Sequence, residues 1–415
     1  MKKKLLKIVL NPLFSGSAIM IIGSNSSNFL NYLFHLIMGR MLGPANYGEL
    51  ASLISIMGLI GVIPGSVALV IVKYISSAKS KDEINSLIAW LRDKTLKISL
   101  IIFLIILIIS PAVTSFLHIN SVIYLVFIAI SFLFSLSAGF NRAILQGLLK
   151  FKEMVLSVLA EYVVKLILCI TLVSLGFAVG GALVGLVISI AVGWYLTTLY
   201  ISVKKTNSKN PNIRSMFLFT IPVVIQSVST TSLYSSDLIL VKHFFSSYEA
   251  GLYAALSTLG KIIFFATGPI SAVMFPLVSK RASEGSSYKK IFILSFGVTA
   301  FFALILLSIY WFFPNLMIML LYGSSYTGAS NLLVWFGLFI TLFTLSSLLI
   351  NFNLSLGRTK LVLFPLLAAL AQVVIIWAYH ATLFNVIIIS TVLTSLLLAS
   401  LLVYSFLSEH KWKLS

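Results

Sequence analysis

Residues 40–53 read RMLGPANYGELASL, and this stretch covers the first turn between two long apolar segments. The segments lie at 14–38 and 48–72. Each is long enough for a helix to cross the hydrocarbon core of a bilayer, which is roughly 30 Å thick and needs about 20 residues. We therefore interpret the stretch as the connection between the first two of a series of membrane spans.

The composition favours a chain that is embedded in a membrane. Of its 415 residues, 60% are hydrophobic and 9% are charged, and the mean hydropathy is +1.09. A soluble domain cannot bury this much apolar surface, and long spans in lipid must be helical because their backbone hydrogen bonds have to close internally. We predict an all-α polytopic membrane protein with about twelve spans, near 14–38, 48–72, 98–117, 121–140, 154–176, 179–201, 217–241, 250–276, 291–313, 329–351, 361–380 and 383–407.

The positions of the basic residues predict the orientation of the chain. Twenty-five of the 29 Lys and Arg residues fall on one side of the predicted spans. The positive-inside rule makes this side the cytoplasm and places both termini there, so we expect a multi-pass protein of the cell membrane. The formal charge of +19 suits contact with anionic lipid head groups. The basic loops lack the interleaved aromatic residues of a base-stacking surface, so no nucleic-acid partner is expected.

The chain divides into two similar halves. A shift of 203 residues places Gly48 on Gly251, at equivalent turns of the two halves. This match indicates duplication, and chance similarity between common membrane residues is the alternative. We expect an N-terminal six-helix lobe at 1–203, a polar cytoplasmic linker at 204–215 and a C-terminal six-helix lobe at 216–415. Because six spans per half make both halves enter the membrane the same way, the halves would be parallel repeats with a site at their interface.

Three short motifs give the chain a family resemblance. The segment RMLGPANYGELASL, the turn EAGLYAAL at 249–256 and the turn LGRTK at 356–360 resemble the oligosaccharide flippases. These form the polysaccharide-transporter branch of the multidrug/oligosaccharidyl-lipid/polysaccharide (MOP) superfamily. The resemblance covers nearly the whole chain and implies two six-helix lobes, a central cavity and alternating access. It also implies translocation of a lipid-diphosphate-linked oligosaccharide from the cytoplasmic to the outer leaflet, for surface polysaccharide biosynthesis.

Two lysines lie deep in predicted spans. Lys165 and Lys261 are each about eleven residues into a span, which at about 1.5 Å per residue is near the bilayer midplane. Charges at this depth cost on the order of 3 kcal/mol, so they point to function. We expect both ammonium groups to contact a diphosphate. The alternatives are a structural pair between Lys165 and Glu161, four residues earlier, and snorkelling of Lys261 to the membrane surface.

The first predicted helix of each half carries a polar stripe. Asn28 and Asn31 share a face of the first span, and Gln226 and Tyr234 share a face of the seventh. Such residues often form hydrogen bonds between membrane helices, which is the structural alternative. Because the stripes occupy equivalent helices, we expect them to line a substrate cavity. The resemblance implies the same, since these two spans face the cavity in that family.

Three further charged residues are candidates for coupling or gating. Glu161 and Asp237 are the acids within spans, and either would suit coupling to H⁺ or Na⁺. Arg40 lies just beyond the outer end of the first span, and pairing with Asp237 would form an outer gate. A solvated position at the membrane surface is the alternative for Arg40. We expect no other cofactor and no metal site, because no His, Asp and Glu spacing suits one.

Other functions fit the sequence less well. A cation-coupled multidrug exporter of the same superfamily would use acids to attract its substrates, whereas the deep lysines favour an anionic cargo. A polytopic glycan polymerase or glycosyltransferase would need a catalytic acidic pair, and the outward loops hold only Glu49 and Glu249. We therefore predict a non-enzymatic protein with no catalytic residues. Its expected partners are the lipid-linked oligosaccharide, membrane lipids and the polymerase or glycosyltransferases of the same glycan.

Overall fold

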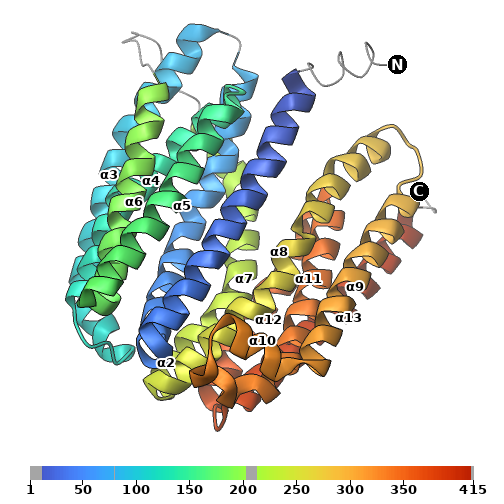
Figure 1. The fold of residues 1–415 in the computed structure, drawn as a ribbon. Helices are drawn as coiled ribbons and strands as arrows, with labels where there is room; N and C mark the ends of the chain where they lie inside the picture. The colour runs from blue at the N-terminus through green and yellow to red at the C-terminus, as the bar shows by residue number, and fades with distance from the viewer. Residues whose placement is uncertain (1–11, 79, 202–212, 413–415) are drawn as a thin grey trace, which may run out of the picture. The chain divides into compact units, whose positions relative to one another are not determined.

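The structure is a computed structural model that describes residues 12–78, 80–201 and 213–412. Within these ranges the chain is almost entirely helical (Figure 1). The first part contains α2 (Pro12–Ser77), α3 (Lys81–Phe116), α4 (Ile123–Gly147), α5 (Phe151–Leu172), the π-helical turn η1 (Val173–Phe177) and α6 (Ala178–Tyr200). The second part contains α7 (Ile213–Phe244), α8 (Ser247–Ser283), α9 (Lys289–Phe312), α10 (Pro314–Leu321), η2 (Ser324–Leu332), α11 (Leu333–Ser355), η3 (Thr359–Val362), α12 (Leu363–Ala378) and α13 (Leu383–Trp412).

The helices confirm the predicted fold class. The described residues contain nine helical segments that are long and apolar enough to cross a membrane. Two of these segments hold two spans each, because Gly43 interrupts Ile22–Ser76 and Gly176 interrupts Phe151–Tyr200 with non-helical backbone angles. With α7, which carries the polar stripe of the seventh span, the chain has about twelve spans. It is a multi-pass membrane protein.

Contacts within the chain group the helices into two units. The first unit comprises residues 1–42 and 60–224, and the second comprises residues 43–59 and 225–415. The second half of α2 therefore begins in one unit and ends in the other. The boundaries of the predicted lobes, 1–203 and 216–415, stay a prediction. Most of the predicted linker, 204–212, lies outside the described residues.

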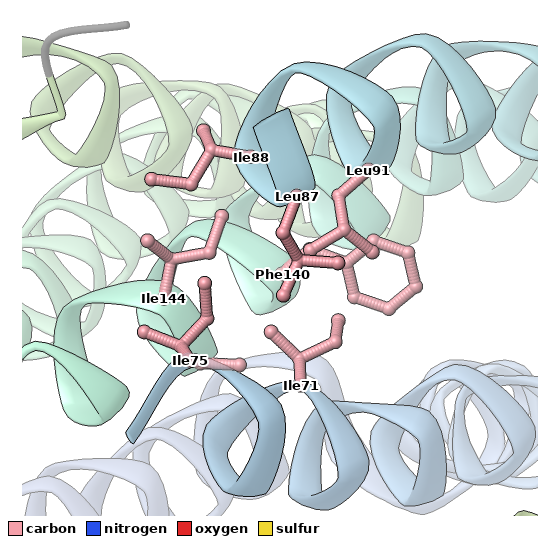
Figure 2. Packing of buried hydrophobic residues seen from close by; sticks show 8 residues of the cluster. Ile71, Ile75, Leu87, Ile88, Leu91, Phe140 and Ile144 are labelled. Atoms are coloured by element: carbon pink, nitrogen blue, oxygen red, sulfur yellow. The ribbon is translucent and has the colours of Figure 1, made fainter. Parts of the chain in front are cut away.

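In the first unit, α3, α4 and α6 pack side by side, and α5 packs on α6 (Figure 1). At one end of this unit, aliphatic side chains of α2, α3 and α4 form a hydrophobic cluster (Figure 2). Ile71 and Ile75 meet Leu87 and Phe140 there. Gly147 permits the close approach of α4 to α2, because an added Cβ would lie 2.7 Å from the side chain of Ile75.

In the second unit, α11 is the central helix. It packs against α8, α9 and α13, and α12 packs against α13. Gly260 of α8 allows Phe336 of α11 to lie directly against the helix backbone, because a Cβ at Gly260 would meet the ring at 2.5 Å. The segment 314–330 between α9 and α11 forms α10 and the start of η2.

The turn at 40–53 is built on glycine. Gly43 adopts φ 69°, a left-handed conformation that other residues rarely reach, and this separates the two limbs of α2. After the turn, Gly48 packs against Gly251, and a Cβ on either glycine would overlap the backbone of the opposite segment. The two glycines that the repeat pattern aligns are therefore direct neighbours in space. Lys242, near the end of α7, is buried and donates to Ser247 Oγ of α8 at 2.8 Å.

Candidate functional site

Lys165 is the deep cation of the first unit. It lies on α5 and is buried. Its ammonium donates a hydrogen bond to Asn31 Oδ1 of α2 at 2.7 Å. The same nitrogen lies 4.3 Å from the ring centroid of Phe34 and 4.4 Å from that of Tyr162. Its immediate partners are therefore one neutral amide and two aromatic faces, which attract a cation without cancelling its charge.

Glu161 does not form the direct pair with Lys165 that helical spacing offers. Its Oε2 instead accepts a hydrogen bond from Arg142 Nη2 of α4 at 2.6 Å. Arg142 also donates to the hydroxyl and the carbonyl oxygen of Ser157, at 3.2 and 3.3 Å. The pair lies against α6 at Gly193, where an added Cβ would overlap both charged groups. Lys165 is thus left with its neutral partners because Arg142 engages the nearby carboxylate.

Asp237 is a buried acid of the second unit. It lies on α7 and its side chain is fully buried. Its Oδ2 accepts a hydrogen bond from the Tyr253 hydroxyl at 2.7 Å, and its Oδ1 accepts one from the backbone N–H of Leu238 at 2.8 Å. Tyr253 lies on α8 and is also fully buried. These bonds satisfy a carboxylate that is otherwise costly to bury.

Lys261 is the deep cation of the second unit. Its nitrogen lies 5.2 Å from the ring centroid of Tyr234. Asp237 attracts it electrostatically across the α7–α8 contact, although the two are not neighbours in sequence. Tyr234 in turn packs against Phe264 and Phe343, which fix the ring under the ammonium. Each of the two lysines therefore has a carboxylate of its own unit nearby, and the difference is that Glu161, beside Lys165, is also engaged directly by Arg142.

The remaining candidates occupy different settings. Asn28 lies one turn before Asn31 on α2 and is exposed. The side-chain oxygen of Gln226 on α7 is buried and has no hydrogen-bond partner among the described residues. Arg40 is exposed at the end of the first limb of α2. It belongs to the first unit and Asp237 to the second, and the outer gate that would join them stays a prediction.

Three residues of these clusters were not identified as candidates from the sequence. Arg142 reads as an ordinary positive-inside charge, and Tyr253 and Tyr162 read as ordinary aromatic residues of a span. Arg142 is 19 residues from Glu161 and sits on another helix, so no periodic pattern joins them. Only Tyr162, which neighbours Glu161 and lies three residues before Lys165, has a sequence signal for its role.

Solved structures share this fold. An inward-facing multidrug resistance MATE family transporter of the MOP superfamily is 14% identical in sequence to this chain. The two structures align with a TM-score of 0.75, over 92% of this chain and 96% of the transporter. The lipid II flippase MurJ, in an inward closed conformation, is 14% identical, with a TM-score of 0.72 over 93% and 87% of the two chains. A MOP superfamily transporter from Pyrococcus furiosus is 16% identical, with a TM-score of 0.63 over 94% of each chain. The fold is thus that of the MOP superfamily transporters.

The family follows from the sequence match. Residues 37–331 match the family model described as polysaccharide biosynthesis protein. The match covers more than half of the chain, and the chain therefore belongs to this family. This confirms the resemblance drawn from the three motifs. The uncharacterized membrane protein MJ1375 of Methanocaldococcus jannaschii is 25% identical over 277 residues, which are 61% of this chain and 65% of that protein's length.

Proposed function

We propose that this protein is a flippase that moves a lipid-diphosphate-linked oligosaccharide from the cytoplasmic to the outer leaflet of the cell membrane by alternating access. The description of its family as polysaccharide biosynthesis proteins supports a glycan-related cargo. The likeness to a lipid II flippase supports a fold able to move a lipid-linked substrate. Both termini would lie in the cytoplasm, as the bias of Lys and Arg predicts.

The observation that carries this proposal is the environment of Lys165. Its charge is buried among Asn31, Phe34 and Tyr162, and the nearest carboxylate is engaged by Arg142. A buried cation held by neutral groups is stabilised when an anion arrives. A diphosphate oxygen would accept the hydrogen bond that Lys165 now donates to Asn31 Oδ1. The Asn31 side chain would then be free to turn, so that its N–H groups donate to the same anion.

The second unit would supply weaker attraction. Lys261 is offset by Asp237, so we assign it a contact with the sugar-phosphate that strengthens when Asp237 is neutralised. Gln226 and Asn28 would bind sugar hydroxyl groups, and Tyr234 would stack against a sugar ring. Glu161 or Asp237 would couple transport to H⁺ or Na⁺, because each is an acid buried beside a cation.

A multidrug exporter is the second candidate, and the likeness to a MATE transporter favours it. Such a protein would attract cationic drugs through carboxylates in its spans. Both spanning carboxylates are already engaged, Glu161 by Arg142 and Asp237 by Tyr253. We therefore favour an anionic cargo and a non-enzymatic role, with glycan polymerase or glycosyltransferases supplying and consuming the lipid-linked unit.

The test compares Lys165→Gln with Lys152→Gln in proteoliposomes. Lys152 lies on the same helix, in its first turn, and is exposed, so its replacement removes one positive charge outside the buried site. The probe is a fluorescent short-chain polyprenyl diphosphate disaccharide, and a matched lipid glycoside without the diphosphate is the control. We expect Lys165→Gln to slow flipping of the diphosphate probe about tenfold or more, because one charge-assisted hydrogen bond is lost.

Three outcomes separate the candidates. Loss of diphosphate flipping in Lys165→Gln alone, with the glycoside slow for every variant, supports the proposal. Equal flipping by Lys165→Gln and Lys152→Gln contradicts the assigned role of Lys165. Efflux of ethidium by the wild-type protein, together with no flipping of either lipid probe, would identify a multidrug exporter instead.

A further inference from the structure

A polar pocket lies at the basic end of the second unit, separate from the side-chain clusters described above. It is a hollow of about 410 Å³ between the end of α8, the α8–α9 turn and the end of α11. Ser279 on its wall is 18 residues beyond Lys261 on α8, which corresponds to about 27 Å along the helix. Five of the lining side chains carry hydroxyl groups and one carries a guanidinium: Ser279, Ser283, Ser286, Tyr288, Ser355 and Arg358.

Arg358 is held in place by a buried amide. Its Nη1 donates to Asn353 Oδ1 at 3.0 Å. Asn353 is fully buried, and its Nδ2 donates to Leu349 O at 2.9 Å and to Ser405 Oγ at 2.7 Å. A guanidinium has five N–H donors, so this contact leaves others for a ligand. The position of the charge is therefore fixed by α11 and α13, and does not depend on an exposed, freely moving side chain.

The opposite wall of the pocket is a well-defined turn. Gly285 adopts φ 67° and ends α8, and the N–H of Ser286 then donates to Arg281 O at 2.9 Å. Tyr288 follows and packs its ring against Phe352 of α11. It immediately precedes α9, which begins at Lys289, and no side chain caps this helix start. The first turn of a helix carries a partial positive charge, which adds to that of Arg358.

The charges around the pocket favour an anion. The same turns carry Lys280, Arg281, Lys289, Lys290 and Lys360. The acid in the α8–α9 turn is Glu284, whose Oε1 lies 3.9 Å from Lys280 Nζ, and both of these side chains are largely exposed. Ser283, Ser286 and Ser355 already donate to backbone carbonyl oxygens. The guanidinium fork and the hydroxyl groups of Ser279 and Tyr288 match the oxygen atoms of a phosphate group. A carboxylate ligand would use fewer of these donors, because it presents only two oxygen atoms.

We propose that this pocket binds a phosphate group, with Arg358 as the principal ligand and the hydroxyl groups of Ser279 and Tyr288 as additional donors. The phosphate would come either from a soluble phosphate compound or from the head group of an anionic phospholipid. The proposal does not depend on the transported cargo, because the pocket lies at the end of the unit and shares no residue with the Lys261 and Asp237 cluster.

The test measures ligand-dependent thermal stabilisation of the full-length protein in nanodiscs. In one arm, inorganic phosphate is added in increasing amounts to the protein in neutral phosphatidylcholine nanodiscs, and chloride at matched ionic strength is the salt control. The other arm replaces part of the phosphatidylcholine by phosphatidylglycerol, without added phosphate. Three variants are compared with the wild type: Arg358→Gln removes the ligand, Ser279→Phe fills the pocket and keeps Arg358, and Lys360→Gln removes a neighbouring charge that does not line the pocket.

We expect Arg358→Gln to weaken the response about tenfold or more, because the loss of one charge-assisted hydrogen bond has this effect on affinity. Ser279→Phe should weaken it as much, because the larger side chain occupies the space of the phosphate. Lys360→Gln should stay within about twofold of the wild type, since exposed charges contribute little. Dependence on Arg358 in the phosphate arm identifies a soluble ligand, and dependence in the phosphatidylglycerol arm identifies a lipid. No stabilisation in either arm, or an equal effect of Lys360→Gln and Arg358→Gln, overturns the proposal.

Discussion

Single residues in this protein act through the partners that neighbouring helices bring to them. If Glu161 formed a direct salt bridge with Lys165, the carboxylate would cancel the positive charge that Lys165 offers to an anionic substrate. Arg142 prevents this by holding Glu161 at 2.6 Å. The formal charge of the cluster formed by Arg142, Glu161 and Lys165 is +1. The formal charge of the pair formed by Asp237 and Lys261 is zero.

Gly193 should be essential to the Arg142–Glu161 pair. A Cβ at this position would overlap both charged groups, so Gly193→Ala should lower the free energy of unfolding by about 1–3 kcal/mol. Gly180→Ala on the same helix is the matched control, because its Cβ would meet only the Tyr124 ring at an ordinary 3.5 Å. Thermal unfolding of the two variants measures the difference. A Gly193→Ala protein as stable as Gly180→Ala would show that the pair shifts without loss.

Asp237 should carry the ion dependence of transport if it is the coupling group. Asp237→Asn keeps the size of the side chain and removes its charge, so we expect flipping that no longer responds to a proton or sodium gradient. Tyr253→Phe is the control, since it deletes one hydrogen bond at 2.7 Å and retains the carboxylate. Transport assays across imposed gradients provide the measurement. Unchanged proton and sodium profiles in Asp237→Asn would exclude this role.

At the scale of the helix, α2 is the element whose sequence and contacts differ most from a simple span. It is broken at Gly43, and its second limb passes from one unit to the other between Leu59 and Ile60. The sequence around this crossing is GLIGVIPG, at 58–65. A Cβ on Gly58, Gly61 or Gly65 would meet nothing within 4 Å, so close packing does not explain these glycines. Their remaining physical effect is a more deformable backbone.

Replacement of Gly61 by Ala should therefore raise the stability of the protein and lower its rate of transport. We expect Gly61→Ala to stabilise the protein by about 0.4–1 kcal/mol, because it restricts the unfolded chain and fits the helix. It should at the same time slow flipping several-fold, because the helix bends less easily where the units join. Gly297→Ala in α9 is the matched control, since a Cβ there also meets nothing within 4 Å. Equal transport by the two variants would argue against a hinge at this crossing.

At the scale of the whole molecule, the basic residues predict how the protein sits in the membrane. The charge asymmetry assigns the α8–α9 turn and the phosphate pocket to the cytoplasm, and it assigns η2 to the outer face. This orientation also sets the direction of the proposed transport, because the lipid-linked unit would enter from the basic side.

Cysteine labelling tests this orientation directly. The two variants are Ser287→Cys and Ser325→Cys. Ser287 lies in the α8–α9 turn, Ser325 lies in η2, and both side chains are exposed. The native Cys169 is buried, so it gives little background. In intact cells a membrane-impermeant maleimide should label Ser325→Cys and should label Ser287→Cys only after the membrane is opened. The reverse pattern would invert the assigned topology and the direction of transport.

The sequence by itself determined the fold class and the approximate number of spans, because the length of an apolar run is a local property. It also indicated Lys165, Lys261, Glu161 and Asp237, because a charge inside an apolar run is visible without any structure. It did not show that Arg142 holds Glu161, that Tyr253 holds Asp237 or that Asn353 holds Arg358. Arg142 and Tyr253 lie on other helices than the acids they hold, and Arg358 lies in the turn that follows the helix of Asn353. Only the packing of these helices and turns decides which groups meet. That packing left Lys165 with neutral partners and built the pocket around Arg358.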